Sequence, residues 1–255
     1  MKNLFSVEGK VVLVTGGSRG IGKMIAEGFV THGAKVYVAS RKQSDVDAVV
    51  AELSPLGACI ALEANLSTEA GCRALAETIA ARESALHVLV NNAGANWGAP
   101  LAEYPDSAWD KVLALNVKGV FHLTRFCQPL LEKAARPGDP ARVINIGSID
   151  GIQVPLLETY AYSASKAAVH HMSRVMAMRL AGQNITVNAV APGPFESKMM
   201  AVTLDRFRDA IVGSCPLGRI GEPEDMAGVA LFLASRAGAY VTGAVIPVDG
   251  GISTK

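Results

Sequence analysis

The sequence of 255 residues predicts one α/β domain of the doubly wound kind, with helices on both faces of a seven-stranded parallel sheet. Three observations predict it. Short apolar runs rich in β-branched residues recur along the chain, helical segments separate them, and a glycine-rich turn follows the first run. Runs that are apolar throughout are typical of strands buried on both faces, and their alternation with helices favours parallel pairing.

The expected strands are the apolar runs Val11–Thr15, Lys35–Ser40, Cys59–Glu63, Val88–Asn91, Arg142–Gly147, Thr186–Ala191 and Val245–Val248. Between them, apolar residues at three- and four-residue spacing predict helices, most clearly over Ile21–Val30 and Ala167–Leu180. Two longer segments, Ser107–Ala135 and Tyr162–Ala181, also read as helices with an apolar face.

The chain contains no internal repeat and no linker-like change in composition, so residues 1–255 are expected to form a single domain. Arg136–Pro140 interrupts a helical segment before the fifth strand and is interpreted as a loop. The stretch Phe195–Cys215 is long enough for a small substrate lid, although an ordinary surface excursion would explain it equally well.

Composition excludes several classes of partner. The 24 basic and 23 acidic residues give a formal charge of +1, which argues against nucleic acid or an anionic membrane. No run approaches the ~20 apolar residues of a membrane span, and residues 1–10 lack a signal-peptide pattern. The four cysteines and five histidines have no metal-ligand spacing, so no metal is expected and the thiols are expected to be reduced. A soluble cytoplasmic protein is the expectation.

A glycine-rich turn, Thr15–Gly22, connects the first strand to the first helix. Glycines let the backbone turn tightly and approach a pyrophosphate, and the helix N-terminus offers its N–H groups to the phosphates. Such a turn alone is a weak signal, but the strand before it and the helix after it support a Rossmann-type dinucleotide site.

The residues after the second strand predict which nicotinamide cofactor binds. An NAD site usually has a carboxylate there for the ribose 2′-hydroxyl, whereas this chain has Ser40 and Arg41. Together with Ser18 and Arg19 they would surround a 2′-phosphate with hydroxyl and cationic donors. Ordinary solvated surface charges are the alternative interpretation of the two arginines, and NADPH is the preferred cofactor.

A serine, a tyrosine and a lysine predict carbonyl chemistry. Tyr162 and Lys166 are four residues apart and therefore share a helix face, and Ser148 follows the fifth strand, at the sheet edge where ligands bind. A tyrosine can act as a general acid if its pKa moves from ~10 towards the working pH, and a nearby ammonium would favour the phenolate. Ser148 would hydrogen-bond the carbonyl oxygen.

The order of these motifs resembles the short-chain dehydrogenase/reductase family over essentially the whole chain. The matching features are Thr15–Gly22, Asn91–Gly94, Asn116, Ser148, Tyr162 with Lys166, and Pro192 with Gly193. The resemblance implies that Tyr162 is the proton donor, that Lys166 tunes it and binds the nicotinamide ribose, and that Ser148 orients the carbonyl. It also implies that Asn116 holds a water in a proton relay.

The resemblance also assigns the cofactor contacts. Together with the turn, they comprise Gly16, Ser18, Arg19, Gly20, Ile21, Gly22, Ser40, Arg41, Asn65, Leu66, Asn92, Ala93, Gly94, Tyr162, Lys166, Pro192, Gly193 and Ser197. Two positions depart from the family pattern: Asn65 replaces an aspartate that accepts from the adenine amino group, and Ser197 replaces a frequent threonine.

Substrate signals are weaker. Trp97, Glu103–Pro105 and Trp109 resemble the branch containing rhamnolipid-type 3-oxoacyl-(acyl-carrier-protein) reductases. Trp97 would line the substrate pocket or pack on its own loop, and Trp109 would pack between helices. Asp150 and Glu158 could face a polar or cationic substrate, but solvent exposure is the favoured interpretation of both.

The expected activity is reversible reduction of a ketone to a secondary alcohol with NADPH. Substrate alternatives are 3-oxoacyl thioesters and small cyclic, aliphatic or polyol-type ketones. A sensor that binds NADPH without turnover is disfavoured, because it would not need a tuned tyrosine. The resemblance implies a homotetramer, for which the two long helical segments offer apolar faces.

Overall fold

The computed structural model describes residues 3–198 and 200–254. Its strands are β1 (Val11–Thr15), β2 (Lys35–Ser40), β3 (Cys59–Glu63), β4 (Val88–Asn91), β5 (Ala141–Ile146), β6 (Ile185–Pro192) and β7 (Val245–Val248). All adjacent strands are parallel, in the order β3-β2-β1-β4-β5-β6-β7. The predicted seven-stranded doubly wound sheet is therefore confirmed, and five of the predicted strands have the predicted bounds.

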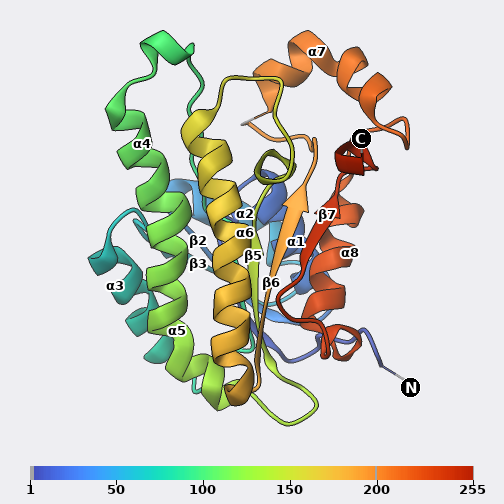
Figure 1. The fold of residues 1–255 in the computed structure, drawn as a ribbon. Helices are drawn as coiled ribbons and strands as arrows, with labels where there is room; N and C mark the ends of the chain where they lie inside the picture. The colour runs from blue at the N-terminus through green and yellow to red at the C-terminus, as the bar shows by residue number, and fades with distance from the viewer. Residues whose placement is uncertain (1–2, 199, 255) are drawn as a thin grey trace.

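Eight α-helices connect the strands of the described chain. They are α1 (Gly20–Thr31), α2 (Gln43–Leu53), α3 (Glu69–Ala80), α4 (Asp106–Leu113), α5 (Val120–Ala134), α6 (Tyr160–Leu180), α7 (Ala201–Ser214) and α8 (Pro223–Ala234). The helices α1, α2 and α8 cover one face of the sheet, whereas α3, α5 and α6 cover the other (Figure 1).

Each strand contributes to two separate hydrophobic cores because its side chains alternate between the faces of the sheet. Leu13 of β1 packs in the core under α3, α5 and α6, while Val12 and Val14 pack in the core under α1, α2 and α8. All five residues of β1 are buried. This explains why the strands read as continuous apolar runs rather than as alternating patterns.

The predicted helix Ser107–Ala135 is not regular. A π-helical segment, Ala114–Gly119, lies between α4 and α5. Such wide turns are rare and often occur at functional sites. Here the segment contains Asn116, and the Asn116 side chain points toward the loop that follows β4.

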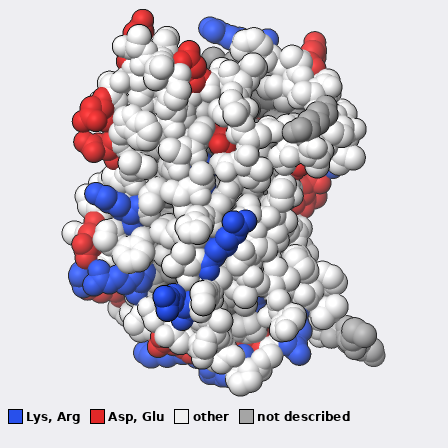
Figure 2. Space-filling model, in the orientation of Figure 1, with Lys and Arg blue, Asp and Glu red and all other residues white. Residues whose placement is uncertain are grey.

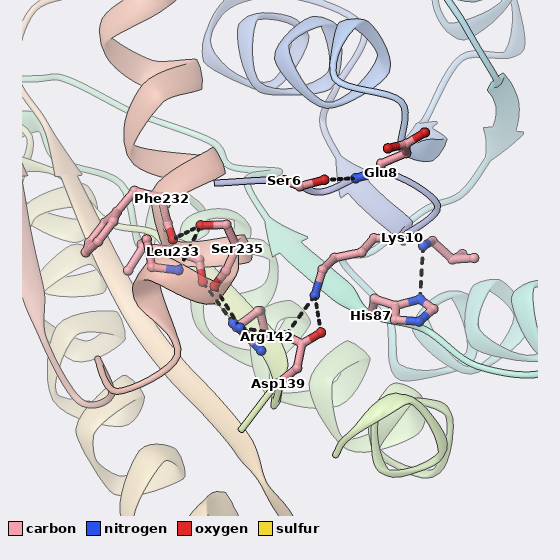
Figure 3. Close-up of polar contacts among 11 residues, drawn as sticks. Ser6, Glu8, Lys10, His87, Asp139, Arg142, Phe232, Leu233 and Ser235 are labelled. Atoms are coloured by element: carbon pink, nitrogen blue, oxygen red, sulfur yellow. Dashed lines mark hydrogen bonds and ion pairs between the residues drawn. The ribbon is translucent and has the colours of Figure 1, made fainter. Parts of the chain in front are cut away.

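A partly buried ion-pair cluster lies at the edge of the sheet opposite the carboxyl ends of the strands (Figure 3). Arg142, at 1% exposure, donates to the carbonyl oxygens of Leu233 at 2.9 Å and Ser235 at 2.8 Å and to the Asp139 carboxylate at 3.0 Å. Lys10 donates to the same carboxylate at 2.9 Å. These contacts join the N-terminal segment, the start of β5 and the end of α8 at the edge of the sheet opposite the candidate active site.

The proposed lid stretch, 195–215, lies at the carboxyl edge of the sheet, and its Met199 lies outside the described residues. Most of it forms α7, which has a kink at Phe207 and is at the top of the molecule in Figure 1. Elsewhere, Arg136–Pro140 is a loop, as predicted. Across residues 3–198 and 200–254, no helix combines the length and apolar character needed to cross a membrane.

Candidate active site

The glycine-rich turn forms a tight cradle between β1 and α1. Gly16 and Gly20 have φ values of +62° and +51°, a region that strains residues bearing a Cβ. A Cβ on residue 22 would lie 2.3 Å from the Gly16 carbonyl oxygen, so the turn can close only with Gly22. Within the described residues, no side chain caps the first turn of α1, which leaves its N–H groups directed at an anion site. This geometry fits a pyrophosphate.

Asn92 and Thr15 fix the shape of this cradle. The Asn92 amide donates to the carbonyl oxygens of Thr15 at 2.9 Å and Gly16 at 3.0 Å. In return, the Thr15 hydroxyl accepts from the backbone N–H groups of Asn92 at 3.0 Å and Ala93 at 3.1 Å. The Asn92 side chain therefore supports the turn from behind, a role that the sequence did not reveal.

The residues predicted to bind the 2′-phosphate lie where β1 and β2 end side by side. Arg19 and Arg41 are exposed there, while Ser18 and Ser40 are half-buried. Asp45 in α2 is an acidic neighbour of these residues, with its carboxylate 3.9 Å from the Arg19 guanidinium. Two exposed guanidiniums and two hydroxyls can bind a phosphate, whereas the carboxylate expected for an NAD ribose is not at the end of β2.

Asn65, after β3, is engaged differently from the family pattern. Its side-chain oxygen accepts from the Ser67 backbone N–H at 3.2 Å and the Ser67 hydroxyl at 2.7 Å. This turn leads into α3, whose N-cap is Thr68, while Leu66 is buried. The oxygen expected to accept from adenine is thus already a hydrogen-bond acceptor within the turn.

Ser148, Tyr162 and Lys166 meet at the carboxyl end of β5. Ser148 lies two residues after the last residue of the strand, Ile146, and the other two lie in the first turns of α6. The Ser148 hydroxyl hydrogen-bonds the Tyr162 phenol and accepts from the Asp150 backbone N–H at 3.1 Å. The Lys166 ammonium donates to the Ile146 carbonyl oxygen at 2.7 Å and lies 5.3 Å from the centre of the Tyr162 ring. The predicted trio is therefore assembled in one place.

The pKa of Tyr162 differs from the expectation. Burial raises it to about 12, and the hydrogen bond from Ser148 only partly opposes that shift. Burial also lowers the pKa of Lys166 to about 8, against a small rise caused by Asp150. Desolvation is the largest cause of both pKa shifts, and the Lys166 ammonium donates to the Ile146 carbonyl oxygen. Tyr162 is consequently a neutral phenol near pH 7, the state that a proton donor requires.

Asn116 connects the π-helical segment to the same site. Its amide donates to the Ala95 carbonyl oxygen and to the Ser165 hydroxyl, both at 2.9 Å, and its oxygen accepts from the Ala95 N–H at 2.8 Å. A Cβ on Gly94 would lie 3.5 Å from the Asn116 oxygen and 3.8 Å from the Lys166 nitrogen. Asn116 and Lys166 therefore both lie beside Gly94, and the water relay that the resemblance implies stays a prediction.

The loop after β6 closes over the phosphate turn. Pro192 ends the strand, and Gly193 packs so tightly that a Cβ there would lie 2.7 Å from the Cβ of Asp249. A Cβ on Gly20 would lie 3.0 Å from the Cβ of Ser197. Residues far apart in sequence thus form one continuous wall at the carboxyl edge.

The two tryptophans belong to a surface cluster. Lys111 lies 4.9 Å from the centre of the Trp97 ring, and the Tyr104 hydroxyl donates to the Trp97 carbonyl oxygen at 3.2 Å. Trp109 packs edge-on to Tyr104 at 6.1 Å. These contacts favour the packing interpretation of both tryptophans.

The two acidic residues near the site differ from each other. Glu158 is exposed, and it accepts hydrogen bonds from the Leu101 N–H at 3.0 Å and from the Tyr160 hydroxyl. Asp150 is half-buried rather than solvated, and burial raises the pKa of its carboxyl group. It interacts electrostatically with Tyr162 and Lys166. Exposure was the wrong expectation for Asp150, because the turn that carries it is pressed onto α6.

His170 is a further residue at this site to which the sequence assigned no chemistry. It is 6% exposed, and its Nε2 accepts from the Ser148 backbone N–H at 3.4 Å. Its position four residues after Lys166 places both on one helix face, and that spacing was the available signal.

Comparisons with known proteins agree with this geometry. The family model adh_short_C2, described as enoyl-(acyl-carrier-protein) reductase, matches residues 16–253. The chain is 47% identical to the rhamnolipids biosynthesis 3-oxoacyl-[acyl-carrier-protein] reductase of Pseudomonas aeruginosa, over 98% of this chain and 99% of that protein. It is 38% identical to the 3-oxoacyl-[acyl-carrier-protein] reductase FabG of Thermotoga maritima, over 96% and 98% of the two chains.

Solved structures show the same likeness. The Pseudomonas aeruginosa RhlG/NADP active-site complex superimposes with a TM-score of 0.95 at 47% identity, covering 99% of this chain and 100% of that one. A putative NAD(P) dependent gluconate 5-dehydrogenase from Beutenbergia cavernae with bound NADP gives a TM-score of 0.91 at 36% identity, with coverage of 99% and 100%. The chain therefore belongs to the short-chain dehydrogenase/reductase family.

Proposed function

We propose that this protein is an NADPH-dependent oxidoreductase that reversibly reduces a ketone to a secondary alcohol, in one NADP-binding domain spanning residues 1–255. The observation that carries the proposal is the meeting of Ser148, Tyr162 and Lys166 beside the glycine cradle. A neutral phenol, a hydroxyl donor and an ammonium converge there. A protein that only senses NADPH has no use for this arrangement.

The residues of the chain divide the work between binding and proton transfer. The cradle would hold the pyrophosphate, Arg19, Arg41 and Ser40 the 2′-phosphate, and Lys166 the nicotinamide ribose. When bound, NADPH supplies the hydride for the carbonyl carbon. Tyr162 gives its proton to the carbonyl oxygen, and the Ser148 hydroxyl donates a hydrogen bond to that oxygen as charge develops on it. Lys166 and Ser148 then stabilise the resulting phenolate.

The preferred substrate class is 3-oxoacyl thioesters, supported by the two reductases from Pseudomonas aeruginosa and Thermotoga maritima. Small cyclic, aliphatic or polyol-type ketones are the second candidate. They are supported by 34% identity to the galactitol 2-dehydrogenase of Cereibacter sphaeroides. We also propose that residues 195–215 act as a substrate lid, since Ser197 in this stretch packs against the phosphate turn.

The function is tested by following NADPH oxidation with the purified protein against a panel of both ketone classes. Turnover with at least one ketone, and a higher kcat/KM with NADPH than with NADH, is the expected result. NADPH binding by calorimetry without turnover of any ketone would favour the sensor instead.

Cofactor preference should reverse when the end of β2 is changed. Replacing Ser40 by Asp and Arg41 by Ala removes donors for the 2′-phosphate and adds a carboxylate that repels it. We expect kcat/KM with NADPH to fall by about 10²-fold, as when a charge-assisted pair is lost, and NADH to become the preferred cofactor. Lys42→Ala, one residue further along, is the matched control. A wild-type preference for NADH would contradict the assignment.

We propose a cytoplasmic homotetramer. The outer faces of α5 and α6 expose apolar side chains that favour burial against another copy, including Phe121, Val175 and, at 80% exposure, Met178. The face that Figure 2 presents carries few charged side chains over these helices, in keeping with this expectation. Light scattering at micromolar concentration should give four times the chain mass, and a monomer mass would contradict the proposal.

A further inference from the structure

The His170 ring lies in a slot between two glycines that flank the Ser148 turn. A Cβ on residue 147 would lie 2.1 Å from His170 Nε2, and one on residue 151 would lie 2.9 Å from its Cε1. The segment Ser148–Gly151 thus presses its backbone onto α6, with the imidazole between its two ends. Neither glycine has a positive φ, so close approach to the ring, rather than backbone conformation, requires glycine here.

The ring is held in its neutral form. It accepts a hydrogen bond from the Ser148 N–H, which requires an unprotonated Nε2. Burial, together with the charges of Lys166 and Arg174, lowers the pKa of His170 to about 4, against a hydrogen bond with the Gly151 backbone that raises it. Asp150 is the acidic group on the same turn. A neutral imidazole therefore bridges the start and the end of the turn at physiological pH.

The same turn sets the direction of the Ser148 hydroxyl. Its oxygen accepts from the Asp150 N–H at 3.1 Å, which leaves its proton to donate to the Tyr162 phenol or to a substrate oxygen. The Ser148 N–H and the Asp150 N–H both belong to the backbone that His170 clamps. A small shift of that backbone would turn the hydroxyl away from the reacting oxygen.

We propose that neutral His170 is a positioning residue for Ser148: its imidazole holds the 148–151 turn on α6, so that the serine hydroxyl is aimed at the carbonyl oxygen. This inference rests on the proposed ketone reduction, and it predicts that His170 acts on turnover through Ser148 rather than through the cofactor.

The kinetic test replaces His170 with two amide side chains of different length, glutamine and asparagine. His170→Gln places an acceptor oxygen near the position of Nε2, whereas His170→Asn is too short to reach the Ser148 N–H. We expect His170→Asn and His170→Leu to lower kcat about tenfold, the effect of losing one orienting hydrogen bond, with an unchanged KM for NADPH. His170→Gln should recover most of kcat. His171→Leu, at the exposed neighbouring position, is the control.

A double-mutant cycle distinguishes positioning from a general loss of structure. In a Ser148→Ala background, His170→Asn should change kcat by less than about twofold, because the group that it orients is gone. Additive losses in the double variant, or equal losses in His170→Gln and His170→Asn, would overturn the proposal.

Hydrogen exchange tests the clamp without any substrate. Amide exchange of residues 148–152 should quicken about tenfold or more in His170→Asn and stay at the wild-type rate in His170→Gln and His171→Leu. Unchanged exchange in His170→Asn would overturn the proposal even if no ketone were turned over. Conversely, the wild-type protein could turn over no ketone while its residues 148–152 exchange slowly and those of His170→Asn exchange faster. That result would count against the proposed function and not against the positioning role of His170.

Discussion

Replacing Tyr162 with Phe should lower kcat by about 10²–10⁴-fold, the usual loss when a general acid is removed. The phenol is needed only when the carbonyl oxygen acquires charge, so the loss falls on the transition state and not on cofactor binding. The pKa of about 12 makes Tyr162 a fully protonated donor at neutral pH. The measurement is steady-state kcat alongside the Kd for NADPH from fluorescence titration, which should remain within about twofold of wild type.

Tyr160→Phe is the matched control for this prediction. Tyr160 lies two residues earlier on α6, and its hydroxyl donates to the Glu158 carboxylate at the surface. Its loss should leave kcat near the wild-type value. An inactive Tyr160→Phe beside an active Tyr162→Phe would show that the assigned proton donor is wrong.

The architecture was predictable because the patterns that specify it lie in short stretches of the sequence. A parallel sheet buried on both faces requires continuous apolar runs, and β1 is such a run with its even and odd residues in different cores. The strand–turn–helix at Thr15–Gly22 was equally legible, since only glycine permits the close approach at residue 22. The spacing of Tyr162 and Lys166 likewise predicted a shared helix face.

What the sequence did not predict depends on tertiary packing. The π-helical segment that carries Asn116 has the same apolar spacing as an ordinary helix, so Ser107–Ala135 read as one regular element. Asp150 read as exposed because its burial is imposed by α6, which lies elsewhere in the chain. His170 had no metal-like spacing, and its packing against the glycines at 147 and 151 depends on a turn that lies elsewhere in the chain.

For the pKa values of Tyr162 and Lys166, too, the sequence predicted the proximity of the two groups but not the effect of tertiary packing. Spacing predicted that Lys166 would lie near Tyr162, and it does, at 5.3 Å from the ring centre. The direction of the tyrosine shift could not be predicted, because desolvation depends on how deeply the groups are buried. Lys166 is only 5% exposed, and its ammonium is engaged by the Ile146 carbonyl oxygen.

Lys166→Met should impair turnover and cofactor binding together, which separates it from Tyr162→Phe. Methionine keeps most of the side-chain volume in this buried position but removes the ammonium. A hydrogen bond from a charged group contributes about 1.5–3 kcal/mol, so the Kd for NADPH should rise about 10- to 150-fold. The variant also removes the charge that stabilises a Tyr162 phenolate, so kcat should fall in addition.

The pH dependence of NADPH binding provides the internal check on this role. Because burial lowers the pKa of Lys166 to about 8, the ammonium is present below that pH and is lost above it. Asp150 is a nearby charged group that opposes the lowering of the Lys166 pKa, while Tyr162, with its pKa raised to about 12, stays a neutral phenol near pH 8. Wild-type affinity for NADPH should therefore weaken as the pH rises through about 8. Because the bound cofactor favours the ammonium, the pKa of Lys166 in the complex should be higher than in the free protein. In Lys166→Met the affinity should be flat over the same range. A variant that retained the wild-type pH dependence would place the titrating group elsewhere and remove Lys166 from the cofactor site.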